Sequence, residues 1–211
     1  MGLPLRIESS PSGRLGGARE SRTMSLVGQR DSDFIQRCRA GEGDAFRLLV
    51  ERYQERILRF VTGVVTNPED ARDIAQEAFV QAYRALHRFD TDRNFYTWLY
   101  RIAMNLAIDR LRRRKANRET TLEELGDLAG PSRDPSGSVL GEELRGQIKE
   151  VLDGLPERYR TVILLRDVEE IPAKEIAEIL GCTHATVRWR LHRARKMFRD
   201  LWERRNHGAD S

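Results

Sequence analysis

The chain has 211 residues, 39% of them hydrophobic and 33% charged, which suits one large domain or two small ones with small cores. It has no apolar run of membrane-spanning length, and its first thirty residues have no apolar stretch that resembles a signal peptide. Its two cysteines, Cys38 and Cys182, are far apart in sequence, so a disulfide framework is not expected. We therefore expect a cytoplasmic protein without membrane insertion.

The net charge is only +4, but the positive charges are concentrated in two stretches, residues 109–115 and 188–199. Basic clusters of this kind bind phosphate, either in nucleic acid or at an anionic membrane surface. Residues 1–30 are rich in Gly, Ser and Arg without apolar periodicity, which predicts a disordered tail. Met24 is an alternative start that the sequence leaves open.

In chain order, a short helix is expected around Phe34, Ile35 and Cys38, ending at Gly41 and Gly43. Asp44 is the expected N-cap of a long second helix. Apolar residues then recur every three or four positions and predict one buried helix face. That face comprises Phe46, Leu49, Val50, Tyr53, Ile57, Phe60, Val61 and Val64.

The third helix is expected to begin at Asn67 and Pro68, because Asn caps helices and proline is favoured at the first helical position. Its apolar face comprises Ile74, Ala75, Ala78, Phe79, Ala82, Tyr83 and Leu86. A polar loop over Asp90–Asn94 separates it from a fourth helix. The inner face of that helix comprises Phe95, Trp98, Leu99, Ile102, Ala103 and Leu106.

Residues 115–141 contain scattered Gly and Pro among acidic and small residues, which predicts a flexible linker. Two further apolar stripes follow, Leu144–Leu155 and Tyr159–Leu165. No alternating strand pattern competes with these helices. The fold class is therefore all-α, with two small helical domains at 31–114 and 142–203 and a short tail at 204–211.

The most specific local signal is Glu175–Arg188, which has the spacing of a helix-turn-helix. Ala177 is small enough for two helices to cross closely, and Gly181 permits the left-handed backbone of the turn. Val187 packs the second helix against the first. Pro172 is placed to start the first helix and Thr183 to cap the second.

The second helix of this motif is strongly basic, and in such motifs it lies in the major groove of DNA. Arginine there can form bidentate hydrogen bonds with guanine, while other cations neutralise phosphates. We expect Arg190 and Arg195 to reach phosphate or solvent. The alternative is a merely solvated helix that ends a bundle, although the motif spacing favours DNA binding.

Two features of the first domain are not explained by packing alone. Phe95, Trp98 and Leu99 read as core, but Tyr96 and Tyr100 are expected to be exposed beside the basic run Asp109–Lys115, as suits unstacked bases. The third helix carries a polar face opposite its apolar one. This face is either solvated or an interface for a basic helical partner, and it comprises Asp70, Asp73, Gln76, Glu77, Val80 and Gln81.

The segments Asp70–Tyr83, Phe95–Ala103, Leu155–Arg160 and the helix-turn-helix together resemble the extracytoplasmic-function (ECF) branch of the sigma-70 family, especially its sigma-E-like members. The resemblance covers residues 31–203 and implies a sigma factor that directs promoter-specific transcription initiation. It also implies a stress response, control by an anti-sigma factor, and neither a catalytic site, a cofactor, a metal nor a small-molecule substrate.

The resemblance assigns a role to each surface. The first domain resembles region 2, whose polar face docks on the clamp coiled coil of the largest subunit of core RNA polymerase; the matching residues are Asp73, Gln76, Glu77, Phe79 and Val80. The loop and helix that follow match the surface for the −10 promoter element and a flipped base. That surface comprises Asp92, Arg93, Asn94, Tyr96, Tyr100, Asn105, Arg112 and Arg113.

The second domain resembles region 4, which reads the −35 element and contacts the polymerase flap. The matching DNA-binding residues are Thr186, Arg188, Trp189, His192 and Arg193. Trp189 and His192 are individual to this sequence, so its −35 element need not follow the common one. The linker is expected near the RNA exit path, where the acids Glu123, Glu124 and Asp127 fit a basic channel.

Two other classes of function stay open from sequence. A stand-alone helix-turn-helix regulator would need a sensor or dimerisation domain in place of region 2. A nucleic-acid enzyme would need chemistry or metal binding from the four histidines, whose spacings match no ligand motif. These are His87, His184, His192 and His207.

Overall fold

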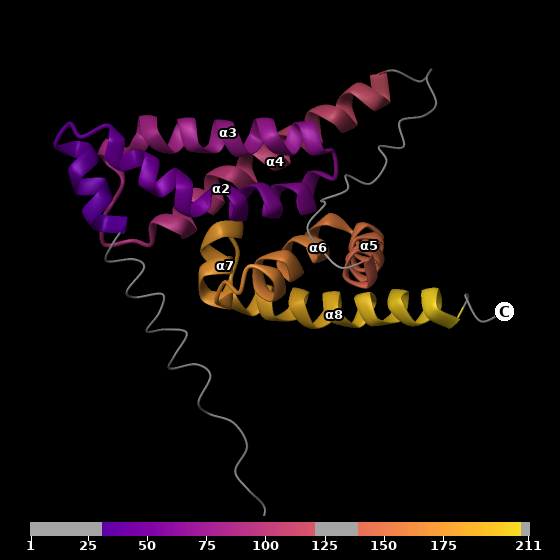
Figure 1. Cartoon of the computed structure of the whole chain (residues 1–211). Coiled ribbons are helices and arrows are strands. Elements are labelled where there is room, and N and C mark those ends of the chain that lie inside the picture. The colour runs from indigo at the N-terminus through magenta and orange to yellow at the C-terminus, as the bar shows by residue number, and fades with distance from the viewer. Residues whose placement is uncertain (1–30, 121–138, 208–211) are drawn as a thin grey trace, which may run out of the picture.

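The computed structural model describes residues 31–120 and 139–207, and within these ranges every regular element is helical. The helices form two groups, shown one above the other in Figure 1. We call residues 31–120 the N-terminal bundle and residues 139–207 the C-terminal bundle. The all-α prediction is confirmed.

The N-terminal bundle is built from α2 (Asp44–Val65), α3 (Pro68–Ala85) and α4 (Phe95–Thr120), with a single 3-10 turn, η1 (Leu86–Arg88), after α3. A short helix at residues 31–39 packs on α2, where the Tyr53 hydroxyl donates a hydrogen bond to the buried Asp31 carboxylate. The predicted apolar faces of the long helices meet in the core. Fully buried residues there include Leu49, Ile57, Val61, Ala78 and Leu99.

The starts of α2 and α3 show which cap predictions hold. Asp44 is the first residue of α2 rather than its cap, since Gly43 occupies the cap position without a side-chain hydrogen bond. At α3 the prediction is confirmed: Asn67 is extended, its side chain accepts a hydrogen bond from the Asp70 amide at 2.9 Å, and Pro68 follows as the first helical residue.

Replacing Asn67 by alanine should therefore lower the free energy of unfolding by about 1 kcal/mol, because an N-terminal amide of α3 loses its partner. Urea denaturation followed by circular dichroism measures this change. Asn67→Asp is the matched control, since aspartate caps as well as asparagine does. Equal loss in both variants would show that the cap is not the cause.

The C-terminal bundle contains α5 (Val139–Asp153), α6 (Glu157–Ile163), α7 (Ala173–Leu180) and α8 (His184–His207). A π-helical turn, η2 (Leu164–Val168), extends α6, and the Glu169 amide closes it by donating to the Leu164 carbonyl at 2.9 Å. Helix α8 lies along the outer edge of this bundle in Figure 1 and contacts α5, α6 and α7.

Some sequence boundaries and faces differ from the structure. Helix α4 runs beyond the predicted domain end to Thr120, and α8 extends into the predicted tail as far as His207. The remaining linker, with its three acids, and the N-terminal tail lie outside the described residues. Three predicted inner-face residues, Tyr83, Leu144 and Ile148, are exposed instead, because each lines an open groove rather than the core.

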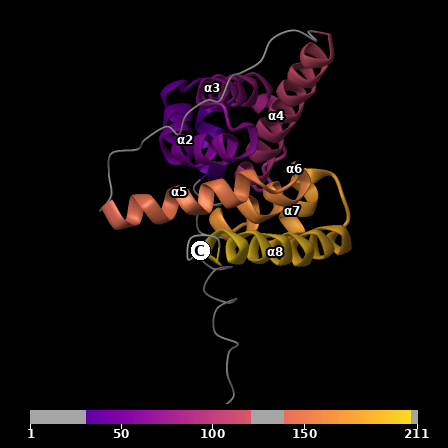
Figure 2. The same ribbon diagram turned by 90° about the vertical axis from the view of Figure 1, so that its right-hand side faces the viewer.

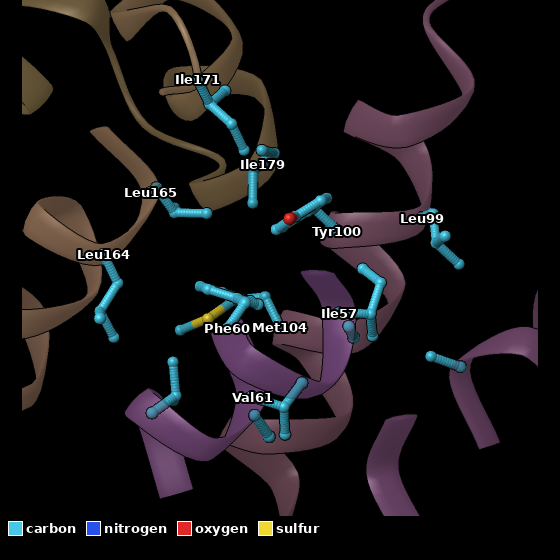
Figure 3. Packing of buried hydrophobic residues seen from close by; sticks show 14 of the residues in the cluster. Ile57, Phe60, Val61, Leu99, Tyr100, Met104, Leu164, Leu165, Ile171 and Ile179 are labelled. Carbon is cyan, nitrogen blue, oxygen red and sulfur yellow. The ribbon is translucent and has the colours of Figure 1, made fainter. Parts of the chain in front are cut away.

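The two bundles pack against each other through one shared apolar cluster, although we expected separate modules on a tether. Figure 3 shows Tyr100 and Phe60 of the N-terminal bundle facing Leu164, Leu165 and Ile171 of the C-terminal bundle. Helix α4 contacts α7, and α2 contacts α6. The turned view in Figure 2 also shows the C-terminal bundle lying below the N-terminal bundle. The physical reason is that each bundle has apolar residues its own helices do not cover.

A glycine marks the closest approach of the two bundles. Gly63 lies on α2, and a Cβ added there would be only 2.6 Å from Leu164 Cδ1. Real Cβ atoms essentially never come so close to another carbon, so a side chain at position 63 would force Leu164 to move. The same glycine costs α2 some intrinsic helix stability.

Candidate functional site

The helix-turn-helix is formed as the sequence predicts. Gly181 ends α7 in the left-handed conformation, with φ of 59°. The Thr183 hydroxyl caps α8 by accepting a hydrogen bond from the Thr186 amide at 3.1 Å. Val187 is fully buried against the first helix. Pro172 stands just before α7, where its carbonyl accepts the first hydrogen bonds of the helix.

The outer face of α8 presents the predicted base-reading residues to solvent. Arg188, His192 and Arg193 are exposed, and Trp189 is 59% exposed beside the Tyr159 ring, with the ring centroids 6.2 Å apart. Thr186 is half-buried, and its hydroxyl is hydrogen-bonded to the Thr183 hydroxyl at 2.8 Å. This face combines charge, an aromatic plane and hydrogen-bond donors, which is the chemistry that base edges require.

Arg195 reaches solvent as expected, and its side chain is 54% exposed. Its guanidinium is occupied by the Asp167 carboxylate, with the Nε–Oδ2 distance at 3.0 Å, rather than free for phosphate. That ion pair raises the pKa of Arg195. Arg190 is half-buried at the edge of a cavity between the bundles.

The outer side of α2 and α3 carries an apolar groove of about 670 Å³. Val50, Leu58, Val80 and Tyr83 line it, and Tyr83 is 53% exposed with its ring against the edge of Phe46. Gln76 and Phe79 also line the groove, whereas the exposed Asp73 and half-buried Glu77 lie on the same helix α3. The predicted polymerase-binding residues therefore combine an apolar groove with an acidic helix.

Asp70 does not belong to that polar face. It is buried at the start of α3 and forms ion pairs with Arg110 and with Arg114, the latter at 2.7 Å. These two arginines are four residues apart and lie on one side of α4. Arg112 and Arg113 are exposed, and Arg112 forms a long ion pair with Asp109 at 3.9 Å.

The loop Asp90–Asn94 is exposed except for Thr91 and leads directly into α4. The Asp90 carboxylate accepts a hydrogen bond from the Asp92 amide at 3.1 Å and pairs with Arg93 at 3.5 Å. Beside it is a polar pocket of about 340 Å³, lined by loop residues, Trp98 and Arg101. Glu178, from α7 of the other bundle, forms part of its wall.

Two predicted exposures in α4 were wrong. Tyr96 is 7% exposed and Tyr100 is 0% exposed, so neither ring faces solvent in this arrangement. Tyr100 is covered because the C-terminal bundle lies over it, and its hydroxyl donates to Glu169 at 2.7 Å. Asn105, further along the same helix, is exposed as expected.

Sequence reasoning missed the carboxylate that joins the bundles. Glu169 is 4% exposed and accepts hydrogen bonds from Arg56 at 3.1 Å, Arg59 at 2.9 Å and Tyr100. Burial and the Glu169 charge raise the pKa of Tyr100. The available signal was an acid two residues before the apolar Ile171, but its partners are more than sixty residues away in sequence.

A second carboxylate of the C-terminal bundle reaches the predicted −10 loop. Glu175, near the start of α7, accepts hydrogen bonds from Thr97 Oγ1 at 2.8 Å and from Asn94 Nδ2 at 3.3 Å. Burial, with a smaller effect of the neighbouring Glu178, raises the pKa of Glu175 to about 7. Protonation near neutral pH is thus coupled to contact between the bundles.

Packing of the two bundles should weaken as pH rises. Packing raises the pKa of the Glu175 carboxyl group from 4.5 to about 7. Its contribution to the stability of the packed state is therefore full at pH values below 4.5 and is lost as the pH rises through about 7. The urea midpoint of the wild type, relative to that of Glu175→Gln, should therefore fall between pH 6 and pH 8. Parallel midpoints across this range would contradict the coupling.

Both cysteines, Cys38 and Cys182, are free thiols that are half-buried against the core. Burial raises the pKa of Cys38, which disfavours the reactive thiolate. Across residues 31–120 and 139–207, no His, Cys, Asp and Glu side chains cluster in a way that could hold a metal ion. Nor does any helix in the same ranges have the length and apolar character to cross a membrane.

Comparisons with known proteins agree with this geometry. Residues 49–117 match the family model for Sigma-70 region 2, and residues 145–198 match that for Sigma-70 region 4. The RNA polymerase sigma-H factor of Pseudomonas aeruginosa is 37% identical over 183 residues, which cover 81% of this chain and 93% of that protein. The ECF sigma factor SigW of Bacillus subtilis is 38% identical, over 79% of this chain and 96% of SigW. The chain belongs to the sigma-70 family, in its ECF branch.

Among solved structures, CnrH in complex with the cytosolic domain of CnrY superposes with a TM-score of 0.64 at 27% identity, covering 86% of this chain and 99% of that one. The N-terminal bundle is thus sigma region 2 and the C-terminal bundle sigma region 4. As an ECF sigma factor, the protein directs promoter-specific initiation of transcription by core RNA polymerase.

Proposed function

We propose that this sigma factor binds its partners through three surfaces. The α2–α3 groove binds core polymerase, the Asp90–Asn94 loop with α4 binds the −10 element, and the outer face of α8 binds the −35 element. The observation that carries this division is the exposure of the groove and of the α8 face on different bundles. The groove and the α8 face can therefore be engaged at the same time.

The polymerase surface would be the groove together with Asp73, Gln76, Glu77, Phe79 and Val80. Its apolar floor supplies burial, and the acids on α3 supply complementarity to a basic helical partner such as the clamp coiled coil. A second apolar groove, between α5 and the end of α8, is a candidate site for the flap. Its lining includes Leu144, Ile148, Phe198 and Trp202.

The −35 element would be read by Arg188, Trp189, His192 and Arg193, with Thr186 near the start of the helix. Arginine can form a fork of hydrogen bonds with guanine, and an exposed Trp ring can contact thymine methyl groups. The paired Arg195 is left out of this surface, because Asp167 holds it.

The −10 element would be captured as single-stranded bases. The polar pocket beside Asp92, Arg93 and Asn94 has donors for a base edge, and Asn105, Arg112 and Arg113 extend along the exposed side of α4. Pulling a base out of the stack costs about a few kcal/mol, so capture couples recognition to melting. Tyr96 and Tyr100 could join only after the bundles part.

Each bundle alone would bind weakly, but one polymerase holds both at a fixed separation. The second contact is then intramolecular, and its effective concentration raises the total affinity. Purified protein with core polymerase should start transcription at a promoter that core polymerase alone ignores. Absence of binding to core polymerase would overturn the proposal.

We further infer a cytoplasmic protein without catalytic activity, held in check by an anti-sigma factor during a stress response. CnrH, a structural relative, has been solved bound to the cytosolic domain of another protein. A regulator that covers the α2–α3 groove or α8 would block the polymerase and promoter surfaces. Affinity purification from cells that recovers no such partner would contradict this inference.

A further inference from the structure

Trp189 is an unusual residue for the centre of the proposed −35 surface. Among the exposed large hydrophobic side chains of the described residues, it has the largest exposed fraction, 59%. Thr186, His192 and Arg193 are three or four residues away along α8 and therefore border it on the helix surface. An indole cannot form the forked hydrogen bonds of an arginine, so its contact with DNA must differ from theirs.

The Trp189 indole is supported on one side by Tyr159 of α6. The two ring centroids are 6.2 Å apart, and the ring planes are tilted by 52°. Aromatic rings attract one another in tilted arrangements at centroid distances of about 4.5–7 Å. Helix α6 contacts α8 within the C-terminal bundle (Figure 1), so this ring pair does not depend on how the two bundles pack.

Tyr159 is itself held on several sides. It is 5% exposed, and its amide donates a hydrogen bond to the Pro156 carbonyl at 2.8 Å in the first turn of α6. The guanidinium carbon of Arg158 lies 4.9 Å from the centroid of the Tyr159 ring, which is a cation–π contact. The next residue, the buried Arg160, donates to Asp153 of α5 at 3.2 Å. Tyr159 is thus a fixed support for a side chain that is otherwise in solvent.

We propose that Tyr159 is a positioning residue for −35 recognition, which holds the Trp189 indole where it covers the 5-methyl group of a thymine in the major groove. This inference rests on the proposed function of α8 and deepens it by naming the base. Tyr159 is buried, so it acts on DNA only through Trp189. The surface that reads the −35 element then depends on α6 as well as on α8.

The chemistry of the indole favours thymine over the other bases. Thymine alone presents an apolar group, its methyl, in the major groove, whereas every base edge also has polar groups there. Apart from its one N–H donor, the indole is apolar, and covering a polar group without a hydrogen bond has a desolvation cost. Burying a methyl group against the ring is favourable instead. Trp189 would therefore select thymine by apolar contact, while Arg188 and Arg193 provide the hydrogen bonds.

The support from Tyr159 matters because Trp189 is exposed before DNA binds. A side chain that becomes ordered only on binding loses rotamer freedom, and this loss lowers the affinity. A ring that already restricts the indole reduces the loss. Removing the Tyr159 ring should therefore weaken the methyl contact and leave the hydrogen-bonding side chains of α8 in place.

The methyl contact is tested with the full chain bound to core polymerase. A pool of promoter duplexes with a randomised −35 segment is first selected for binding by the wild type. Each thymine of the selected element, on either strand, is then replaced singly by deoxyuridine, which keeps every hydrogen-bonding group and lacks only the methyl. At one position this replacement should lower the wild-type affinity about fourfold, the effect expected for one buried methyl-sized group.

Four variants separate positioning from general stability at that position. Trp189→Ala should bind the thymine and deoxyuridine duplexes alike. Tyr159→Leu keeps an apolar side chain without the ring, and the ratio of the two affinities should fall to about twofold or less. Tyr159→Phe restores the ring and should restore the ratio of about fourfold. Val162→Ala is the matched control, because Val162 is fully buried on the same helix without an aromatic ring, and any loss of affinity should be equal for both duplexes.

The outcomes distinguish this inference from the function on which it rests. A selected element without thymine, or one in which no replacement affects the wild type or in which Trp189→Ala keeps the ratio, overturns the thymine contact. A wild-type ratio in Tyr159→Leu, or an equal fall of the ratio in Val162→Ala, overturns the positioning role of Tyr159. If the wild type enriches no −35 sequence at all, the proposed function of α8 itself fails.

Discussion

Replacing Val80 by lysine should lower the affinity of this sigma factor for core RNA polymerase by at least about thirtyfold, the effect of losing a hot spot of about 2 kcal/mol. Val80 lies half-buried in the apolar groove between α2 and α3. An ammonium group there would be stripped of water when a partner docks, and it would repel a basic coiled coil. Fluorescence-monitored titration of core polymerase measures the affinity.

Val168→Lys is the matched control. Val168 is 43% exposed, and it lies on η2 in the C-terminal bundle, away from the groove. It should bind core polymerase like the wild type, with circular dichroism confirming that both variants are folded. Wild-type affinity of Val80→Lys would place the polymerase surface elsewhere.

Replacing Arg188 by alanine should lower transcription from a mapped promoter about tenfold or more, since a bidentate arginine–guanine pair provides about 1–3 kcal/mol of discrimination. Arg188 is exposed at the start of α8, where recognition helices contact bases. Arg188→Lys keeps the charge but loses the fork of donors, so it should fail nearly as badly. Single-round transcription with core polymerase measures both variants.

Arg204→Ala removes an equal charge from the far end of the same helix, where the Arg204 side chain donates to the Asp200 carbonyl. It should leave promoter-directed transcription nearly unchanged. Full activity of Arg188→Lys would show that Arg188 contacts a phosphate rather than a base. In that case the remaining loss in Arg188→Ala should shrink as salt is raised.

The two acids at the bundle interface change how variants of this protein should be interpreted. Glu169 and Glu175 lie in region 4, yet their hydrogen-bond partners belong to region 2. A substitution in either region can therefore act on the other through the interface between the bundles. Variants of Tyr100 are the clearest case, because this ring is both a proposed −10 residue and a partner of Glu169.

The sequence by itself determined the helices, the caps of α3 and α8, and the helix-turn-helix, although it misplaced the cap of α2. Periodic apolar residues identify the buried helix faces. The roles of Asn67, Gly181 and Thr183 can be predicted from sequence because each acts through neighbours only a few residues away. The exposed face of α8 follows from the same periodicity, because Val187 and Leu191 must point inward. Family resemblance then assigned that face its expected role.

Only the tertiary structure decided which polar residues are free. Asp70 forms ion pairs with Arg110 and Arg114. Arg195 donates a hydrogen bond to Asp167, and Tyr100 donates one to Glu169. Each of these pairs joins residues on different helices, and no periodicity of one helix encodes the position of another. The packing of the bundles is of the same kind: it brings Gly63 close to Leu164 across about a hundred residues of chain, a contact that three-dimensional packing alone creates.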